Sequence, residues 1–430
     1  MPDRASFTSP LAEELAAPLL ERFCRYVKID TQSSRDPTGS PSTPGQLVLG
    51  RLLVDELHAS GLVDAALDDN GYVTASLQTT MDASEEAATV GLLAHLDTSP
   101  DAPGAGVEPI VHRAYAGGII ELPRGDTRLD PSSMPELASK VGHDLVSSSG
   151  DTLLGADDKA GVAAVMSAIA YLAAHPELRR PQLRIAFTPD EEIGGGAALL
   201  DIARFGASCA YTIDGSELGE LQDETFSAVE AIITITGVDV HPGQAKGKMV
   251  NALRLAARML AALPSDALAP EVTAGREGFI HPYSLTGSPA QAQLRVIVRD
   301  FDDDLLASHV ALLERTAHEV VDSEPRAKLA IDLHEQYRNM RRYIEPTPRI
   351  MDAAAEAIRA EGIEPLRRPI RGGTDGSRLS ERGLPTPNIF NGGHEYHSVR
   401  EWVSLQDMAA AAATLVRLAE IWATPPAAPQ

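Results

Sequence analysis

Histidine and carboxylate side chains follow several short apolar runs in this chain of 430 residues. His95 and Asp97 come directly after residues 90–93, an apolar run that predicts a buried strand. Residues two apart in an extended segment point the same way, so the Asp97 carboxylate can hold the second ring nitrogen of His95. Such a partner orients a metal-bound histidine. The structural alternative is a His–Asp pair that only caps a loop.

Two adjacent acids, Asp157 and Asp158, lie where a short loop meets an Ala-rich segment that predicts a helix over residues 161–172. A single Asp at this place could serve only as the N-cap of the helix. Two acids directly before a buried helix are harder to explain as surface residues. The segment therefore offers a candidate metal ligand, while the capping role stays open.

Three successive acids, residues 190–192, follow a predicted strand over residues 183–187 and precede three glycines. Consecutive acids usually form a solvated surface run. Here a buried strand delivers them to the carboxyl edge of a sheet, where the sites of α/β proteins lie. Successive residues point in different directions, so Glu192 can bind a metal while Glu191, unligated, transfers protons as a general base.

Asp214 follows another predicted strand, and His397 lies in a glycine-containing loop near the C-terminal end. Together with His95, Asp157 and Glu192 they form a nitrogen and oxygen set suited to zinc, with cobalt or manganese as alternatives. If Asp157 bridges two ions, one takes His95 and Asp214 as well. The other then takes Glu192 and His397. Two divalent ions nearly balance the three carboxylates, and together they would acidify a water and polarise a carbonyl.

The elements that must position these side chains fall into two patterns. Predicted strands and helices alternate up to about residue 224 and again from about residue 336, which predicts a mixed, mostly parallel sheet with helices on both faces. Between them the order is βαββαβ, that of a small ferredoxin-like unit. The chain is therefore predicted to be an α/β protein. Its catalytic domain comprises residues 1–224 and 336–430, and residues 225–335 form an inserted domain.

The composition excludes several classes of protein. The net charge is −24, and no Lys/Arg-rich run offers a surface for nucleic acid or an anionic membrane. The N-terminal residues lack the continuous apolar core of a signal peptide, and no apolar stretch is long enough to span a bilayer. Cys24 and Cys209 are expected to be buried free thiols, with a disulfide as the alternative. A cytoplasmic enzyme is the expectation.

Longer blocks of sequence carry a resemblance to a known family. The blocks are HLDTSPD (95–101), LGADDKAG (154–161), FTPDEEIGGGA (187–197), DGSELGEL (214–221), GVDVHPGQAKGKMVNA (237–252), GFIHPYSL (278–285), RVIVRDFD (295–302), YRNM (337–340) and RGGTDGSRLSERGLPTPNIFNGGHEYH (371–397). In this order they resemble the dizinc family of aminoacylases and carboxypeptidases, and within it the tripeptide aminopeptidases of the peptidase T group. The resemblance covers nearly the whole chain.

The resemblance implies a metal-dependent aminopeptidase that hydrolyses the N-terminal peptide bond of tripeptides through a water activated by two metal ions. It implies the five ligands named above, Glu191 as the general base and Asp97 as the residue that orients His95. The inserted domain would be a lid and a dimerisation domain, so a homodimer is expected.

Contacts to the peptide substrate are also implied by the resemblance. His241 would help to stabilise the oxyanion, in its own subunit or across to a partner. Asn251, Arg299 and Arg371 are candidates for gripping the carboxylate of the peptide, since Arg can engage a carboxylate through two hydrogen bonds. Arg299 has a structural alternative as the partner of Asp300.

Some positions depart from the family pattern, and other functions stay open. Asp158 stands where Asn is expected, and Arg400 where His is familiar; the family typically holds the 157–158 peptide bond cis. A dipeptidase, a carboxypeptidase or an N-deacylase would share the same metal centre. A metal-binding scaffold or partner-binding module without catalysis is the alternative from another class, and Glu191 and Asp97 count against it because merely holding metal needs neither.

Overall fold

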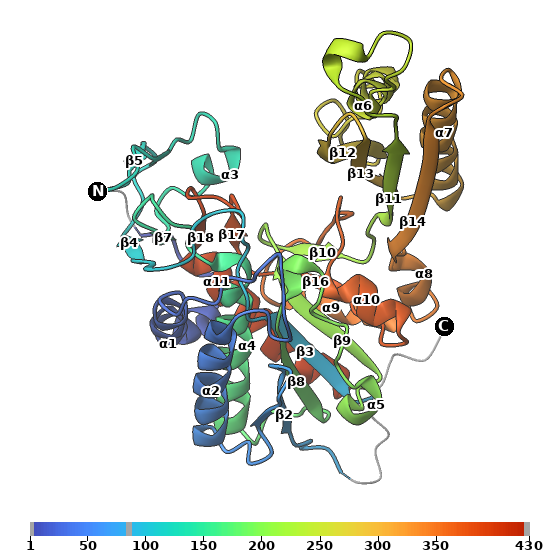
Figure 1. Ribbon diagram of the computed structural model, residues 1–430. Helices are drawn as coiled ribbons and strands as arrows, with labels where there is room; N and C mark the ends of the chain where they lie inside the picture. The colour runs from blue at the N-terminus through green and yellow to red at the C-terminus, as the bar shows by residue number, and fades with distance from the viewer. Residues whose placement is uncertain (1–3, 83–87, 425–430) are drawn as a thin grey trace. The chain divides into compact units, whose positions relative to one another are not determined.

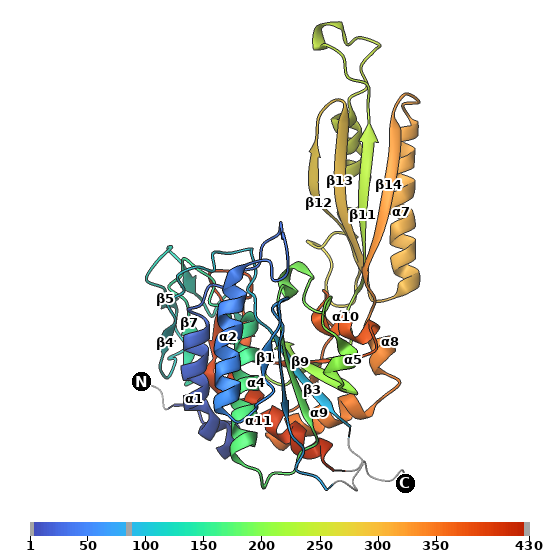
Figure 2. The ribbon, with the colours of Figure 1, turned by 60° about the horizontal axis from the view of Figure 1, so that its bottom comes forward.

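The chain folds into two compact units, seen in a computed structural model that describes residues 4–82 and 88–424. The first unit contains the described residues of Met1–Asp223, Arg342–Arg368 and Thr374–Gln430. The second contains Glu224–Arg341 and Pro369–Gly373. Figure 1 and Figure 2 label the elements of both units.

The helices and strands are numbered in chain order. The helices are α1 (Pro10–Tyr26), α2 (Pro44–Ala59), α3 (Pro135–Ala138), α4 (Ala156–Ala174), α5 (Ile202–Phe205), α6 (Ala252–Ala262), α7 (Asp303–Asp322), α8 (Arg341–Ile344), α9 (Arg349–Ala360), α10 (Asp375–Glu381) and α11 (Leu405–Trp422). The strands are β1 (Ala66–Leu67), β2 (Val73–Leu77), β3 (Val90–His95), β4 (Ile110–His112), β5 (Ile120–Glu121), β6 (Arg128–Leu129), β7 (Leu145–Ser147), β8 (Leu183–Thr188), β9 (Cys209–Gly215), β10 (Glu220–Gln222), β11 (Ser227–Thr236), β12 (Phe279–Gly287), β13 (Gln291–Asp300), β14 (Lys328–Tyr337), β15 (Leu366–Arg367), β16 (Asn388–Phe390), β17 (Gly393–His394) and β18 (Trp402–Ser404).

The first unit is built on an eight-stranded sheet in the order β1-β2-β8-β3-β9-β16-β10-β15. The central strands β8, β3, β9 and β16 are parallel to one another, and β1, β2 and β10 add antiparallel pairs. Strand β3 is buried along its whole length because both of its faces are covered, as its unbroken apolar run predicts. The predicted mixed α/β sheet is confirmed.

Helices cover both faces of this sheet (Figure 1), and two neighbouring residues of β9 show how. Ala210 packs in an apolar cluster with Phe205 of α5 and Leu379 of α10. The next residue, Tyr211, points to the opposite face, since side chains alternate along a strand. There its hydroxyl donates to the carbonyl oxygen of Ile350 in α9 at 2.7 Å. Helix α4 packs against β3 and β9 as well as against α1 and α11.

Two smaller sheets in the first unit were not predicted from the sequence. Strands β17, β18, β7 and β4 form a four-stranded antiparallel sheet, and β5 pairs with β6. Their strands are only two or three residues long, too short for a periodic apolar pattern. The first of these sheets anchors the ends of the segment between His394 and Trp402, which contains His397.

The second unit is a four-stranded antiparallel sheet in the order β12-β13-β11-β14. Along the chain its elements follow the order β11-α6-β12-β13-α7-β14, which is the βαββαβ order expected from the sequence. Residues of α6 and α7, among them Leu255 and Leu313, pack with Ile233, Leu294 and Val296 of the sheet in one apolar core.

Both cysteines, Cys24 and Cys209, are free thiols, as expected; Cys209 is buried, whereas Cys24 is only partly buried. Among residues 4–82 and 88–424, no helix is long and apolar enough to cross a membrane.

The first turns of α4 approach the end of β9 so closely that only glycine fits at position 161. A Cβ added to Gly161 would lie 2.3 Å from the carbonyl oxygen of Ile213 and 2.3 Å from Oδ1 of Asp158. Backbone on one side and a buried carboxylate on the other leave little room for relaxation. This contact holds the start of α4 against the sheet.

We therefore expect Gly161→Ala to lower the free energy of unfolding by about 1–3 kcal/mol, the usual cost of overpacking. Urea denaturation of the metal-free protein measures it. Gly39→Ala is the control, since a Cβ there meets no heavy atom within 4 Å. Equal stability of the two variants would contradict the packing described for α4.

Candidate metal centre

The centre forms at the carboxyl ends of the parallel strands β8, β3 and β9. His95 is the last residue of β3, and Asp214 lies near the end of β9. Glu191 and Glu192 begin a short 3₁₀ helix that starts three positions after the last residue of β8. These strands are neighbours in the sheet, so their ends meet at one edge, where α/β sites lie.

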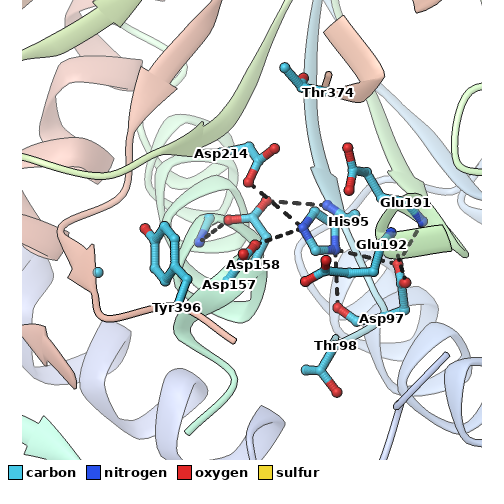
Figure 3. A network of polar contacts seen from close by, with 12 residues as sticks. His95, Asp97, Thr98, Asp157, Asp158, Glu191, Glu192, Asp214, Thr374 and Tyr396 are labelled. Atoms are coloured by element: carbon cyan, nitrogen blue, oxygen red, sulfur yellow. Dashed lines mark hydrogen bonds and ion pairs between the residues drawn. The ribbon is translucent and has the colours of Figure 1, made fainter. Parts of the chain in front are cut away.

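Asp157 lies between the two predicted histidine ligands. Its Oδ1 is 2.8 Å from Nε2 of His95, and its Oδ2 is 3.3 Å from Nε2 of His397. The same nitrogen of His95 is 3.7 Å from Oδ1 of Asp214, and that of His397 is 2.9 Å from Oε2 of Glu192. The structure thus brings all five predicted ligands together, with one oxygen of Asp157 facing each histidine. Figure 3 shows His95, Asp157 and Asp214 from close by.

Two groups of side chains in the described part of the chain could each hold an ion. Their ligand atoms lie within 4.8 Å of one another in the sets His95, Asp157, Glu192 and His95, Asp158, Asp214. The second set contains Asp158, but backbone and amide donors already occupy this carboxylate. Oδ2 accepts from the N–H of His95 at 3.2 Å, and Oδ1 accepts from Nδ2 of Asn391 at 3.0 Å. Asp158 is thus better suited to support the centre than to bind metal.

The peptide bond between Asp157 and Asp158 is cis, as the family resemblance implies.

The pKa values of Asp157 and of the groups around it differ strongly from their usual values. Burial raises the pKa of Asp157, but hydrogen bonds with His397 and His95 outweigh it and hold that pKa below its usual range. Burial raises the pKa of Glu192 to about 8 and that of Asp214 to about 6. Burial lowers the pKa of His397, yet hydrogen bonds to Asp157 and Glu192 raise it to about 11. The buried carboxylates thus create a demand for positive charge, which divalent cations satisfy.

The side chains fit a divalent metal in donor chemistry as well as in charge. Imidazole nitrogens and carboxylate oxygens are the ligands that zinc, cobalt and manganese accept. Oε1 of Glu192 is buried and has no hydrogen-bonding partner among the residues that the structure describes. A buried carboxylate oxygen without a donor is costly, and a cation would satisfy it.

Asp97 connects His95 to the two glutamates. Nδ1 of His95 lies 3.0 Å from the carbonyl oxygen of Asp97 and 3.3 Å from its Oδ1. The carboxylate also accepts the backbone N–H groups of Glu191 at 2.9 Å and Glu192 at 3.2 Å. The carboxylate thus does more than the sequence predicted, since it holds the backbone of the predicted base and ligand as well.

Glu191 is absent from both candidate metal groups. Its Oε1 accepts the backbone N–H of Asp375 at 3.1 Å. Asp375 is buried and accepts a hydrogen bond from the hydroxyl of Thr188 at 2.6 Å. Asp375 was not predicted as a site residue, although it lies in the block RGGTDG, because its contact to Glu191 is made through the backbone and leaves no trace in residue type.

Two further acids hold the loops of the centre. Asp190 has φ +58° and accepts hydrogen bonds from the side chain of Gln46 at 2.7 Å and from Ser42. Oδ2 of Asp101 lies 3.2 Å from Nδ1 of His397, the ring nitrogen that faces away from Asp157. Arg35 forms an ion pair with Asp101. The position of Asp101 in HLDTSPD was visible in the sequence, but its pairing with a residue 296 positions away was not.

The four predicted substrate contacts belong to the second unit. His241 is exposed, and its Nδ1 accepts the N–H of Gly243 at 3.1 Å. Asn251 caps α6 by accepting the N–H of Arg254 at 3.2 Å.

Arg371 is already engaged within this unit. It donates to the carbonyl oxygens of Gly275 at 3.0 Å and Glu277 at 2.8 Å. Arg299 lies beside the rings of Phe279 and Tyr337 and donates to the carbonyl oxygen of Arg371 at 3.4 Å. Both arginines thus have structural partners.

Comparisons with known proteins agree with these motifs. Residues 153–421 match the model of peptidase family M20/M25/M40. The chain is 48% identical to the Peptidase T of Shouchella clausii over 403 residues, which cover 94% of this chain and 98% of that protein. The predicted resemblance is confirmed.

Solved structures show the same fold. The aminopeptidase PepT from Bacillus cereus has a TM-score of 0.73 at 21% identity, covering 95% of this chain and 99% of its own. A tripeptidase from Staphylococcus aureus has a TM-score of 0.74 at 21% identity, covering 95% of this chain and 98% of its own.

We expect Asp101→Asn to weaken zinc binding about 10-fold, because a neutral amide orients the His397 ring less firmly than a carboxylate does. Competition with a chromophoric chelator measures the affinity of the metal-free protein. Asp69→Asn, a neutralisation of an exposed acid on a surface turn, is the matched control. Unchanged affinity in Asp101→Asn would show that His397 needs no such support, or is no ligand.

Proposed function

This chain belongs to peptidase family M20/M25/M40 and is a dinuclear metallopeptidase, and we propose that it removes the N-terminal residue from tripeptides. The observation that carries the proposal is the placement of Asp157, whose two carboxylate oxygens each face a different histidine. The 48% identity to the Peptidase T of Shouchella clausii over 98% of that protein, and the description of a structural neighbour as a tripeptidase, support the choice of substrate.

We propose that Asp157 would hold both of two ions. His95 and Asp214 would complete one site, and Glu192 and His397 would complete the other. The short distances from each histidine to its carboxylate partners support this division. Zinc is the preferred metal, with cobalt or manganese as alternatives, because the donors are nitrogen and oxygen. When bound, such ions supply Lewis-acid chemistry that acidifies water and polarises the scissile carbonyl.

Glu191 is the proposed general base. It takes a proton from the attacking water and delivers it to the nitrogen of the leaving amine. The Asp375 N–H holds its carboxylate, and the Asp97 carboxylate holds its backbone N–H, so the side chain is kept in one orientation. Asp97 also fixes the ring of His95 through Nδ1.

The remaining assignments concern the second unit. We propose that residues 225–335 form a ferredoxin-like domain, inserted between catalytic segments 1–224 and 336–430, that acts as a lid and dimerisation domain. Its strand order supports the ferredoxin-like description. His241 is the proposed donor to the oxyanion, and Asn251, Arg299 and Arg371 are the proposed contacts to the peptide carboxylate. The structural hydrogen bonds of Arg371 make it the least free of the three. A cytoplasmic location and a homodimer complete the proposal.

Substrate polarity and metal dependence test the activity together. The metal-replete protein should release the N-terminal residue of free tripeptides, and it should leave N-acetylated tripeptides intact. Chelation should abolish turnover, and zinc, cobalt or manganese should restore it. Chromatography of the products of free and blocked di-, tri- and tetrapeptides gives the answer. Cleavage of the acetylated peptides, or release of the C-terminal residue, would favour the N-deacylase or carboxypeptidase alternative.

Glu191→Gln tests the base. Metal content should remain that of the wild type, because Glu191 is not a ligand, while kcat falls about 10²–10⁴-fold as proton transfer is lost. Elemental analysis and steady-state kinetics on a tripeptide provide the two readings. Glu21→Gln removes an exposed carboxylate from α1 and serves as the charge-matched control. Turnover retained by Glu191→Gln would exclude Glu191 as the base.

A further inference from the structure

The N-terminal end of α4, which carries Asp157, is held by a carboxylate from far along the chain. Glu401 lies between His397 and β18. Its Oε2 accepts the N–H groups of Leu154 at 2.8 Å and Gly155 at 2.7 Å, and its Oε1 accepts the N–H of Asp157 at 2.9 Å. Glu401 and Asp157 are 244 positions apart in the sequence. Both oxygens of one side chain thus hold the backbone at the N-terminal end of α4.

The three backbone N–H groups replace the water that Glu401 loses on burial. Glu401 is 1% exposed, and a buried carboxylate is stable only when hydrogen bonds replace its lost water. Bonds to an ionised acceptor are shorter and about twice as strong as bonds between neutral groups. Gly155 has φ +82°, so the loop turns sharply at the residue that Glu401 holds most closely. The three bonds therefore define the path of the backbone into Asp157.

We propose that Glu401 is a positioning residue that fixes the Asp157 carboxylate between His95 and His397. It lies four positions after His397, so one segment supplies both a ligand and the support of the bridging ligand. Glu401 acts through the backbone and does not touch the reacting atoms. This inference rests on the proposed role of Asp157 as a ligand, and it adds a residue that neither the motifs nor the candidate metal groups contain.

A purely structural role would look similar in a stability measurement, so a matched control is needed. Glu361 is also 1% exposed and lies in the same unit. Its Oε1 accepts a hydrogen bond from Nε of Arg417 at 2.9 Å, and its Oε2 one from the hydroxyl of Ser9. Glu361→Gln thus removes the charge of an equally buried glutamate without touching the loop of Asp157.

The experiment compares zinc binding to metal-free wild type, Glu401→Gln and Glu361→Gln by competition with a chromophoric chelator. Glutamine keeps the size of glutamate but turns an amide NH₂ toward backbone N–H donors, so the loop loses part of its support. Glu401→Gln should bind zinc at least about 10-fold more weakly, the usual effect of removing a partner that orients a ligand. Glu361→Gln should lose thermal stability while its zinc affinity stays within about twofold of the wild type. Wild-type zinc affinity and stoichiometry in Glu401→Gln would overturn the proposal.

Hydrogen exchange covers the case in which Glu401→Gln does not fold. In the metal-free wild type, the backbone amides of Leu154, Gly155 and Asp157 should exchange slowly, as measured on proteolytic fragments of the labelled protein. Exchange there as fast as in an unstructured peptide would overturn the proposal without any variant.

The outcomes also separate this inference from the proposed function. Weaker zinc binding in Glu401→Gln, combined with no tripeptide turnover by the wild type, would contradict the substrate assignment but not the positioning role. Tripeptide turnover by the wild type, combined with unchanged zinc binding in Glu401→Gln, would contradict the positioning role but not the substrate assignment. A wild type that binds no zinc would overturn both.

Discussion

The centre depends on one carboxylate that faces two histidines from distant parts of the chain. Asp157 presents Oδ1 to His95, at the end of β3, and Oδ2 to His397, in the loop before β18. Glu192 and Asp214 lie beside the same histidines. A carboxylate is the side chain best able to serve two cations at once, since each of its oxygens can face one of them. The sheet, the helix α4 and the C-terminal loop must all keep their places for this arrangement to persist.

Other buried carboxylates around the centre hold the backbone segments that carry its side chains. Asp97 holds the N–H groups of the Glu191–Glu192 segment, Asp158 accepts the N–H of His95, and Glu401 holds the N-terminal end of α4. In each case backbone N–H groups donate to a buried carboxylate and help to fix its position. An acid-rich centre thus contains two kinds of carboxylate, those directed at the proposed metals and those directed at the backbone. Their hydrogen-bonding partners, rather than their residue type, tell them apart.

The sequence predicts the carboxylates directed at the proposed metals far better than it predicts those directed at the backbone. Apolar runs before His95, Glu191 and Asp214 mark buried strands, and acids or histidines at the ends of such strands are visible without any structure. The order of elements in the second unit follows in the same way from period and length. The contacts of Asp375 and Glu401 cannot be predicted from the sequence. Backbone N–H groups are present at nearly every residue, and the partners lie far apart in the chain. The short strands of the β17-β18-β7-β4 sheet were missed because two or three residues carry no period.

The most direct test of this account is an anomalous-diffraction measurement on crystals of the zinc-replete protein, with data collected on both sides of the zinc absorption edge. Two zinc peaks should appear in each chain, one beside His95 and Asp214 and the other beside Glu192 and His397. Asp157 should contribute one oxygen to each. A single peak, or two peaks that Asp157 does not join, would contradict the bridged centre from which the proposed function is built.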